Sequence, residues 1–352
     1  MKYLFKRFSK TDLKSFIALS RKVYSVSNPV TNSEHINWKH LKAPFGPSFI
    51  FGLIDGKKWV GRLMVQPTRF WIKEKKTTIH ILADLVLMKE YRNPVSNFID
   101  LISLQNKEMI GKLILHTGNE KSIPLYTKLL NYYKAFDLST FCFVKNPFKI
   151  LGEKLKLKYF YLFDFFLYPI KYTLIFISNF LLSFCKLSFL IDKIVSEKEI
   201  SQIISANKKN EIFIDRSENF IKWRYGIYSK KKVTYIKIYR KDVFIGYFII
   251  VEKRYTKLKL YIIHDFMINP LRRNFDFIFI KFYLLLRFLK SSNDLLITMA
   301  NDKSRIGNKI LGFPFFRVSD NFLPHSSPFF VRNSKFMHFE SMHLTLADID
   351  YL

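Results

Sequence analysis

The chain has 352 residues, of which 49% are hydrophobic and 17% aromatic, and it carries a formal net charge of +30. This length fits two domains of ordinary size, and the apolar content excludes a largely disordered chain. The two cysteines form no CxxC pair, which excludes a disulfide framework and a cysteine zinc site and suits a reducing compartment. The first residues lack the apolar core of a signal peptide, so we expect a cytoplasmic protein, with the inner face of the membrane as the alternative location.

The excess of positive charge has two interpretations. It attracts polyanions such as nucleic acid, anionic lipid or phosphorylated ligands. It also follows from a lysine-rich proteome, which we favour because Lys, Ile, Phe and Asn are abundant while Ala and Gly are scarce. No nucleic-acid-binding motif is visible, so we rank nucleic acid below an anionic membrane surface as a partner.

In the first half of the chain, apolar periodicity predicts alternating helices and strands. We expect a helix over 11–24, a hairpin from 48–53 and 59–65, a strand over 68–72, a strand over 80–87, a helix over 98–110, a strand over 111–116 and a short helix from Tyr126 to Leu130. The polar turn from Lys89 to Pro94 joins a strand to a helix. Free backbone N–H groups at such a helix start suit an anion.

The second half of the chain repeats these landmarks at a nearly constant offset. The offset is 185 for Trp38–Trp223 and Gly61–Gly246, 181 for Asp84–Asp265, and 182 for Asn119–Asn301 and Ser122–Ser304. We therefore predict an α/β fold with a mixed sheet, present as two tandem copies of one domain. The predicted boundaries are 1–150 and 211–335, with a linker at 151–210 and a tail at 336–352.

The linker contains a very apolar and aromatic stretch, 159–191, with three interpretations. A helix packed on the two domains is the one we favour, and a helix lying in a membrane surface comes second. A membrane-spanning helix comes third, because a span needs about 20 apolar residues and the cleanest run, Tyr172 to Cys185, is shorter. Beyond Gly312-Phe313-Pro314, the residues Phe329 to Arg332 are typical of one last edge strand.

Two motifs in the first half resemble those of the GNAT superfamily of N-acyltransferases, specifically its tandem two-domain members. The first is the family's Arg/Gln-x-x-Gly-x-Gly/Ala turn, which holds the pyrophosphate of an acyl-coenzyme A. Here the turn runs from Arg92 to Asn97, with Val95 and Asn97 in place of the glycines. The resemblance implies that Arg92, Asn93, Val95, Ser96 and Asn97 bind the cofactor. It also implies that the main chain of Leu85, Val86 and Leu87 pairs with the pantetheine arm.

The second motif is the family's Asn-x-x-Ala/Ser-x-x-x-Tyr, matched here by Asn119, Ser122 and Tyr126. The resemblance implies that Asn119 and Ser122 contact the cofactor. It implies that Tyr126 protonates the leaving thiolate as a general acid, although a buried helix tyrosine is the competing interpretation. The second copy has Asn308 at the tyrosine position, so we place the chemistry in the first copy and regard the second as structural or substrate-holding.

Acyl transfer to an amine also needs a base or a proton relay. Asp84 and Glu120 are the catalytic carboxylates that we select, with Glu90 close by in sequence. Desolvation of Asp84 would suit a base, but its recurrence as Asp265 favours a structural role, and water can serve as the relay.

The function that we expect is transfer of an acyl group to an amine, with acetyl-CoA or another acyl-CoA as co-substrate and no metal. The acceptor amine would be a small molecule, such as an amino sugar or a cell-surface precursor. One alternative is a Fem-like transferase that uses aminoacyl-tRNA, for which the positive charge would be useful. The other is an inactive GNAT fold that serves in binding or membrane association.

Overall fold

The computed structural model describes residues 4–8, 12–25, 28–93, 96–118, 123–157, 159–226, 232–255, 257–269, 274–318, 327–331, 342–345 and 348. The chain divides into two compact units. Unit 1 comprises 1–70, 76–136 and 327–337, and unit 2 comprises 71–75, 137–326 and 338–352.

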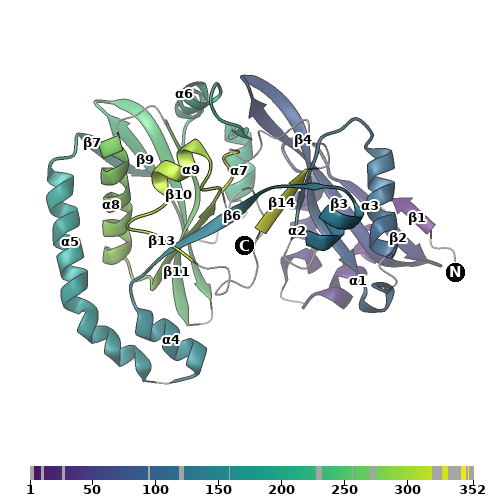
Figure 1. The fold of residues 1–352 in the computed structure, drawn as a ribbon, viewed down its shortest axis with the longest axis horizontal. Helices are drawn as coiled ribbons and strands as arrows, with labels where there is room; N and C mark the ends of the chain where they lie inside the picture. Colours follow the sequence, from purple (N-terminus) through teal and green to yellow (C-terminus); the bar gives the residue numbers. More distant parts are fainter. Residues whose placement is uncertain are drawn as a thin grey trace. The chain divides into compact units, whose positions relative to one another are not determined.

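The first half of the chain supplies the first copy of the repeat (Figure 1). Its elements are β1 (Leu4–Arg7), α1 (Leu13–Val23), η2 (Pro29–Thr31), α2 (Ser33–Ile36), η3 (Asn37–Leu41), β2 (Phe49–Asp55), β3 (Lys58–Ile72), β4 (Lys75–Leu87), η4 (Lys89–Tyr91), α3 (Ser96–Glu108), β5 (Ile114–Thr117), η6 (Leu125–Leu129) and β6 (Tyr133–Val144). The predicted strands at 59–65 and 68–72 are one strand, β3, that continues through Pro67.

A connecting region follows, formed by α4 (Pro147–Leu155), η7 (Phe160–Leu167) and α5 (Tyr168–Ser183). The elements of the second copy are β7 (Leu187–Asp192), α6 (Glu197–Asn207), β8 (Phe213–Ile214), α7 (Glu218–Gly226), β9 (Lys232–Arg240), β10 (Val243–Tyr255), β11 (Leu258–Ile268), α8 (Asn274–Lys290), β12 (Leu295–Ala300), α9 (Arg305–Ile310) and β13 (Phe316–Arg317). A last strand, β14 (Ser327–Val331), comes after them.

The two units have sheets with the same strand order. Unit 1 has β1-β2-β3-β4-β5-β14 and unit 2 has β7-β9-β10-β11-β12-β6. In both sheets one central pair is parallel, β4 with β5 and β11 with β12. The edge pairs, β1 with β2 and β7 with β9, are antiparallel in both. The predicted α/β fold in two copies is therefore confirmed.

The sixth strand of each sheet comes from the other half of the chain. β6 follows η6 of the first copy, yet it pairs antiparallel with β12 of unit 2 from Ser139 to Val144. β14 follows the second copy and pairs antiparallel with β5 of unit 1, from Phe329↔Thr117 to Val331↔Leu115. This exchange is why the compact units differ from the linear boundaries 1–150 and 211–335.

The predicted linker at 151–210 is shorter in the structure. β7 pairs with β9 as an edge strand, and α6 begins at a capping box in which Ser196 and Glu199 satisfy each other's backbone. Both elements belong to the second copy, where they take the places of β1 and α1 in the first. Only α4, η7 and α5 form the connection. α5 packs along α8 of the same unit (Figure 1).

Recurrent glycines mark a close approach of two strands in each copy. A Cβ atom at Gly246 would lie 2.6 Å from Met267 O in the adjacent strand. A Cβ atom at Gly61 would lie 3.1 Å from the Leu87 side chain. The two glycines occupy the same place beside the end of the central strand, so the sequence offset reports a shared packing constraint.

Candidate active site

The two parallel strands of unit 1 separate at one point. β4 and β5 pair from His80↔Ile114 to Leu82↔His116, the last parallel pair among the described residues. The Thr117 hydroxyl donates a hydrogen bond to Leu82 O at 3.1 Å and marks the end of the pairing. β4 continues for five residues to Leu87. Beyond Leu82, β4 has no further pairing with β5 among the described residues, and the pairing of Leu85, Val86 and Leu87 with a pantetheine arm stays a prediction.

Unit 2 diverges at the equivalent point. β11 and β12 pair as far as Ile263↔Thr298, and the Thr298 hydroxyl donates to Ile263 O at 3.0 Å. The two threonine hydrogen bonds are related by the offsets 298 − 117 = 181 and 263 − 82 = 181. The duplication thus includes the separation of the strands as well as the sheet.

The predicted phosphate turn lies between the end of β4 and the start of α3. Arg92 Nε donates to Leu87 O at 3.1 Å, and the buried Asn97 donates through its side chain to Tyr91 O at 2.8 Å. Tyr91 in turn donates to the Asp55 carboxylate at 2.7 Å. These bonds hold Arg92 and Asn97, which lie on either side of two residues outside the described chain. Since the first turn of α3 contains no acidic residue, the N-terminus of this 13-residue helix favours an anion.

Tyr126 is enclosed by aromatic rings, among them that of His116, near the point where β5 separates from β4. Its ring stacks on Phe330 at 4.8 Å between centroids and meets the edges of His116 and Tyr132 at 5.0 and 5.6 Å. Burial raises the pKa of the Tyr126 phenol well above its ordinary value, and Tyr132 adds to the shift. The phenol therefore stays protonated at neutral pH, which a general acid requires, while its proton becomes harder to donate.

Asp84 is engaged with a buried arginine. Nε and Nη2 of Arg62 donate to Asp84 Oδ2 at 3.1 and 2.6 Å, and the Tyr24 hydroxyl donates to Oδ1 at 3.3 Å. The Arg62 side chain is fully buried, with its guanidinium 4.2 Å from the centroid of the Phe16 ring. An isolated buried cation is costly, so these contacts favour a charge-compensating role for Asp84, and its role as a base stays a prediction.

His116, which is not among the predicted site residues, lies where β4 and β5 separate. It is the last β5 residue paired with β4, it is fully buried, and it meets both Tyr126 and Tyr132 edge-on. A histidine at the end of the run 111–116 was the only available signal. Four predicted site residues lie outside the described residues: Val95, Asn119, Glu120 and Ser122.

The strand separation of unit 2 is occupied by the C-terminal segment 342–345. Asn301 N donates to Leu344 O at 3.2 Å, and Asn301 Nδ2 donates to Met342 O at 2.8 Å. His343 Nε2 lies 2.9 Å from Phe266 O of β11. Residues 342–345 are all fully buried. They bond to Asn301 and Phe266, which lie beyond the last pair of β11 and β12. The protein itself therefore fills the position in unit 2 that is equivalent to the candidate ligand site.

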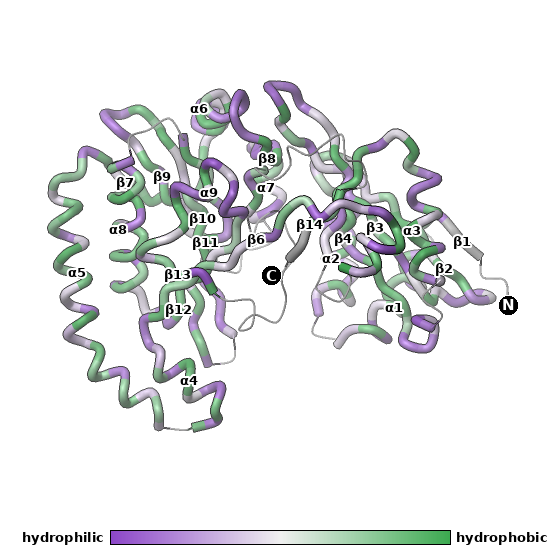
Figure 2. Tube along the Cα trace, viewed as in Figure 1, coloured by the Kyte–Doolittle hydropathy of each residue, from purple (hydrophilic) through white to green (hydrophobic). Residues whose placement is uncertain are grey.

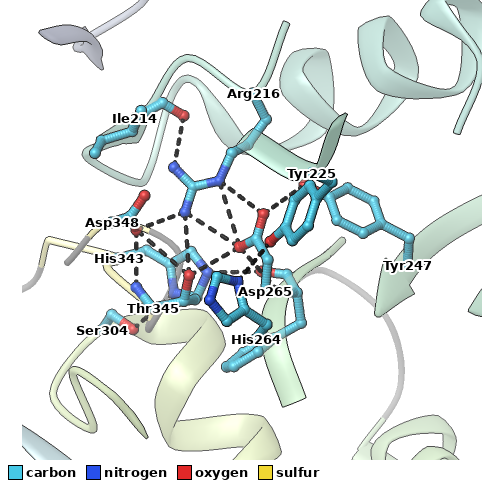
Figure 3. Close-up of polar contacts among 11 residues, drawn as sticks. Ile214, Arg216, Tyr225, Tyr247, His264, Asp265, Ser304, His343, Thr345 and Asp348 are labelled. Atoms are coloured by element: carbon cyan, nitrogen blue, oxygen red, sulfur yellow. Dashed lines mark hydrogen bonds and ion pairs between the residues drawn. The ribbon is translucent and has the colours of Figure 1, made fainter. Parts of the chain in front are cut away.

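A buried ionic cluster anchors this segment (Figure 3). Arg216 donates to Asp265 Oδ2 at 3.1 Å and to Asp348 Oδ2 at 2.6 Å, and all three side chains are fully buried. The Thr345 hydroxyl donates to Asp265 Oδ1 at 2.9 Å. Burial alone would lower the pKa of Arg216, but the two carboxylates raise it. Burial raises the pKa of Asp348, and Arg216 opposes that shift.

The recurrent aspartates therefore have different arginine partners. Asp84 pairs with Arg62 of β3. The position equivalent to Arg62 in β10 holds Tyr247, at the offset 247 − 62 = 185, and Tyr247 donates to Asp265 at 3.4 Å. Arg216 supplies the positive charge instead. Because Asp265 also binds the C-terminal segment, the second copy uses this position for packing.

No family model matches the sequence, and no curated protein matches it. Solved structures do match. A GCN5-related N-acetyltransferase from Anabaena variabilis ATCC 29413 is similar with a TM-score of 0.60 and 13% identity, over 97% of this chain and 75% of that one. A probable N-acyltransferase from Enterococcus faecalis V583 has a TM-score of 0.59 and 11% identity, over 94% and 72% of the two chains.

The N-myristoyltransferase of Saccharomyces cerevisiae, solved with bound myristoyl-CoA, has a TM-score of 0.52 and 13% identity, over 94% of this chain and 84% of that one. These similarities extend over both units. The chain has the GNAT fold. The resemblance seen in the motifs of the first half is thereby confirmed for the fold, and the chain contains two copies of that fold.

Proposed function

We propose that this GNAT chain is an acyl-CoA-dependent N-acyltransferase whose donor site lies in unit 1. The observation that carries the proposal is the continuation of β4 beyond its last parallel pair with β5, next to the cation-bearing turn before α3. Unit 2 has the same separation, but residues 342–345 occupy it. We therefore expect one donor site per chain, in unit 1.

The residues of unit 1 suit the parts of an acyl-CoA. The backbone of residues 84–87 would pair with the amides of the pantetheine arm, as an added strand does. Lys89, Arg92 and the N-terminus of α3 would hold the pyrophosphate. The solved yeast relative was crystallised with an acyl-CoA of this kind, myristoyl-CoA, which supports an acyl-CoA as the co-substrate.

The reaction would be direct transfer between thioester and amine. The neutral amine attacks the thioester carbonyl, a C–N bond forms, and the C–S bond breaks as the tetrahedral intermediate collapses. The sulfur leaves with the electron pair and takes a proton, for which Tyr126 is the candidate donor. The ammonium proton passes to water or to a carboxylate, with Asp84 and Glu120 as the predicted candidates.

The acceptor is an amine, and we propose an amino sugar or a cell-surface precursor. The reaction would take place in the cytoplasm, where both cysteines, which are free in the structure, would stay reduced.

A thiol-release assay tests this proposal. Purified full chain is mixed with acetyl-CoA or myristoyl-CoA and with amino sugars or short peptides that have a free amino terminus. We expect free thiol to appear only when an amine is present, at a rate proportional to enzyme. The proposal fails if no donor releases thiol above the uncatalysed rate. Salt-sensitive tRNA binding in the same preparation would then select the aminoacyl-tRNA alternative.

A further inference from the structure

The segment formed by η7 and α5 carries many exposed large apolar side chains, and much of α5 has the green of hydrophobic residues in Figure 2. It runs from Phe160 to Ser183 and is long and apolar enough to cross a membrane. Exposed aromatic side chains extend along it. A soluble domain rarely exposes a continuous apolar patch of this kind without a partner.

One face of α5 is already covered within unit 2. Leu174, Ile175 and Leu181 pack on Phe282, Leu285 and Leu289 of α8. Ser178 on the same face is fully buried. α8 itself is buried on its other side, where Leu284 and Phe288 are fully buried. α5 therefore cannot leave α8 without exposing apolar side chains on both helices.

The opposite face of α5, with the C-cap residue that follows it, carries an aromatic stripe, which we define as Tyr168, Tyr172, Phe176, Phe180 and Phe184. These residues recur every four positions, so they lie along one side of the helix. Their side chains are 45%, 65%, 71%, 55% and 64% exposed, respectively. The stripe is free of acidic groups, since no Asp or Glu occurs between Asp164 and Asp192.

Charge identifies the kind of partner. The chain has a net charge of +30, so two copies repel each other while an anionic lipid surface attracts the chain. Lys156 and Lys186 are exposed on either side of the segment, and Lys171 lies over the Tyr168 ring at 5.6 Å. Aromatic side chains with flanking lysines are typical of helices at the membrane interface.

We propose that the aromatic stripe docks unit 2 onto an anionic membrane, with α5 lying in the plane of the interface. The covered face on α8 opposes a spanning helix, because a span would have to leave α8, which is itself buried within unit 2. This inference does not depend on the chemistry of unit 1. It would place the acyltransferase next to lipid-linked or surface-bound acceptors.

Vesicle flotation with the full chain tests the docking. We expect wild type to float with vesicles of phosphatidylcholine and phosphatidylserine, and to float less with phosphatidylcholine alone or at high salt. The double variant Phe176→Glu, Phe180→Glu should lose at least about tenfold of its partitioning. Ile110→Glu is the matched control, since Ile110 is 76% exposed but lies in unit 1, in the turn that follows α3, and it should float like wild type.

A second variant reports docking without disturbing the fold. Phe176→Trp places an indole on the aromatic stripe, and its emission should shift to the blue when anionic vesicles are added. After expression in cells, alkaline carbonate should release the wild-type chain from membranes, because an interfacial helix does not span. The proposal is overturned if wild type does not float, if the stripe variants float unchanged, if Ile110→Glu is equally impaired, or if carbonate leaves the chain in the membrane. A stripe that instead mediates dimers in solution, without vesicle binding, would also overturn it.

Discussion

Replacement of Arg216 with alanine is expected to lower the free energy of unfolding by about 3–5 kcal/mol. The side chain is fully buried between Asp265 and Asp348. Its removal leaves two buried carboxylates, Asp265 and Asp348, without a counter-charge, and these carboxylates then repel each other. Thermal and urea unfolding, followed by circular dichroism, would measure the loss.

Two comparisons make this result specific. Arg317→Ala removes an exposed ion pair with Asp302, in which the arginine side chain is 60% exposed, so the loss should stay below about 1 kcal/mol. The triple variant Arg216→Met, Asp265→Asn, Asp348→Asn removes all charges together and should recover part of the loss. Equal effects of Arg216→Ala and Arg317→Ala would show that the cluster does not hold the C-terminal segment.

Tyr126→Phe is expected to reduce kcat by about 10²- to 10⁴-fold, the usual contribution of a positioned general acid. Phenylalanine keeps the stacking on Phe330 and the edge contacts with His116, so acyl-CoA affinity and thermal stability should change little. Steady-state kinetics of thiol release, together with a melting curve, would separate the two effects.

The matched control for this prediction is Tyr133→Phe, because Tyr133 is 59% exposed and should be silent. The pH profile gives a further check. Burial holds the pKa of Tyr126 above its ordinary value, so its deprotonation should not limit kcat below about pH 10. An unchanged kcat in Tyr126→Phe would assign Tyr126 to the core alone and leave water as the proton donor.

Local patterns in the sequence predicted most elements of both copies because each copy has its own strands and helices at regular spacing. The recurrent Gly61 and Gly246 have a local cause, the close approach of neighbouring strands. The recurrent Asp84 and Asp265 both compensate a buried arginine. The constant offset therefore reflects a real duplication, and the matching hydrogen bonds of Thr117 and Thr298, where the parallel strands separate, extend it.

The exchange of β6 and β14 was beyond local patterns. Pairing of distant strands depends on tertiary packing, and the sequence pattern of an edge strand does not indicate which sheet the strand joins. β7 and α6 were assigned to the linker for the same reason. Their membership of the second copy depends on the pairing of β7 with β9, which the local sequence does not indicate.

Filling of unit 2 by the C-terminal segment was also outside sequence reasoning. Residues 342–345 are few and of mixed polarity, and they acquire their role from Asn301 and Phe266, far away in the chain. Arg216 likewise stands 49 residues before Asp265. No spacing rule connects such partners, so the filled position in unit 2 could not be predicted from the sequence, while the candidate site that the motifs indicate in unit 1 stays a prediction.

The central claim is that unit 1 binds one acyl-CoA and unit 2 binds none. Isothermal titration calorimetry with acetyl-CoA measures this most directly, on wild type, Arg92→Ala and the exposed control Arg254→Ala. The account predicts one molecule per chain, weakened about 10- to 100-fold by Arg92→Ala through the loss of a charged hydrogen bond to phosphate, and unchanged by Arg254→Ala. No binding at all, two molecules per chain, or equal affinity in Arg92→Ala and wild type would contradict it.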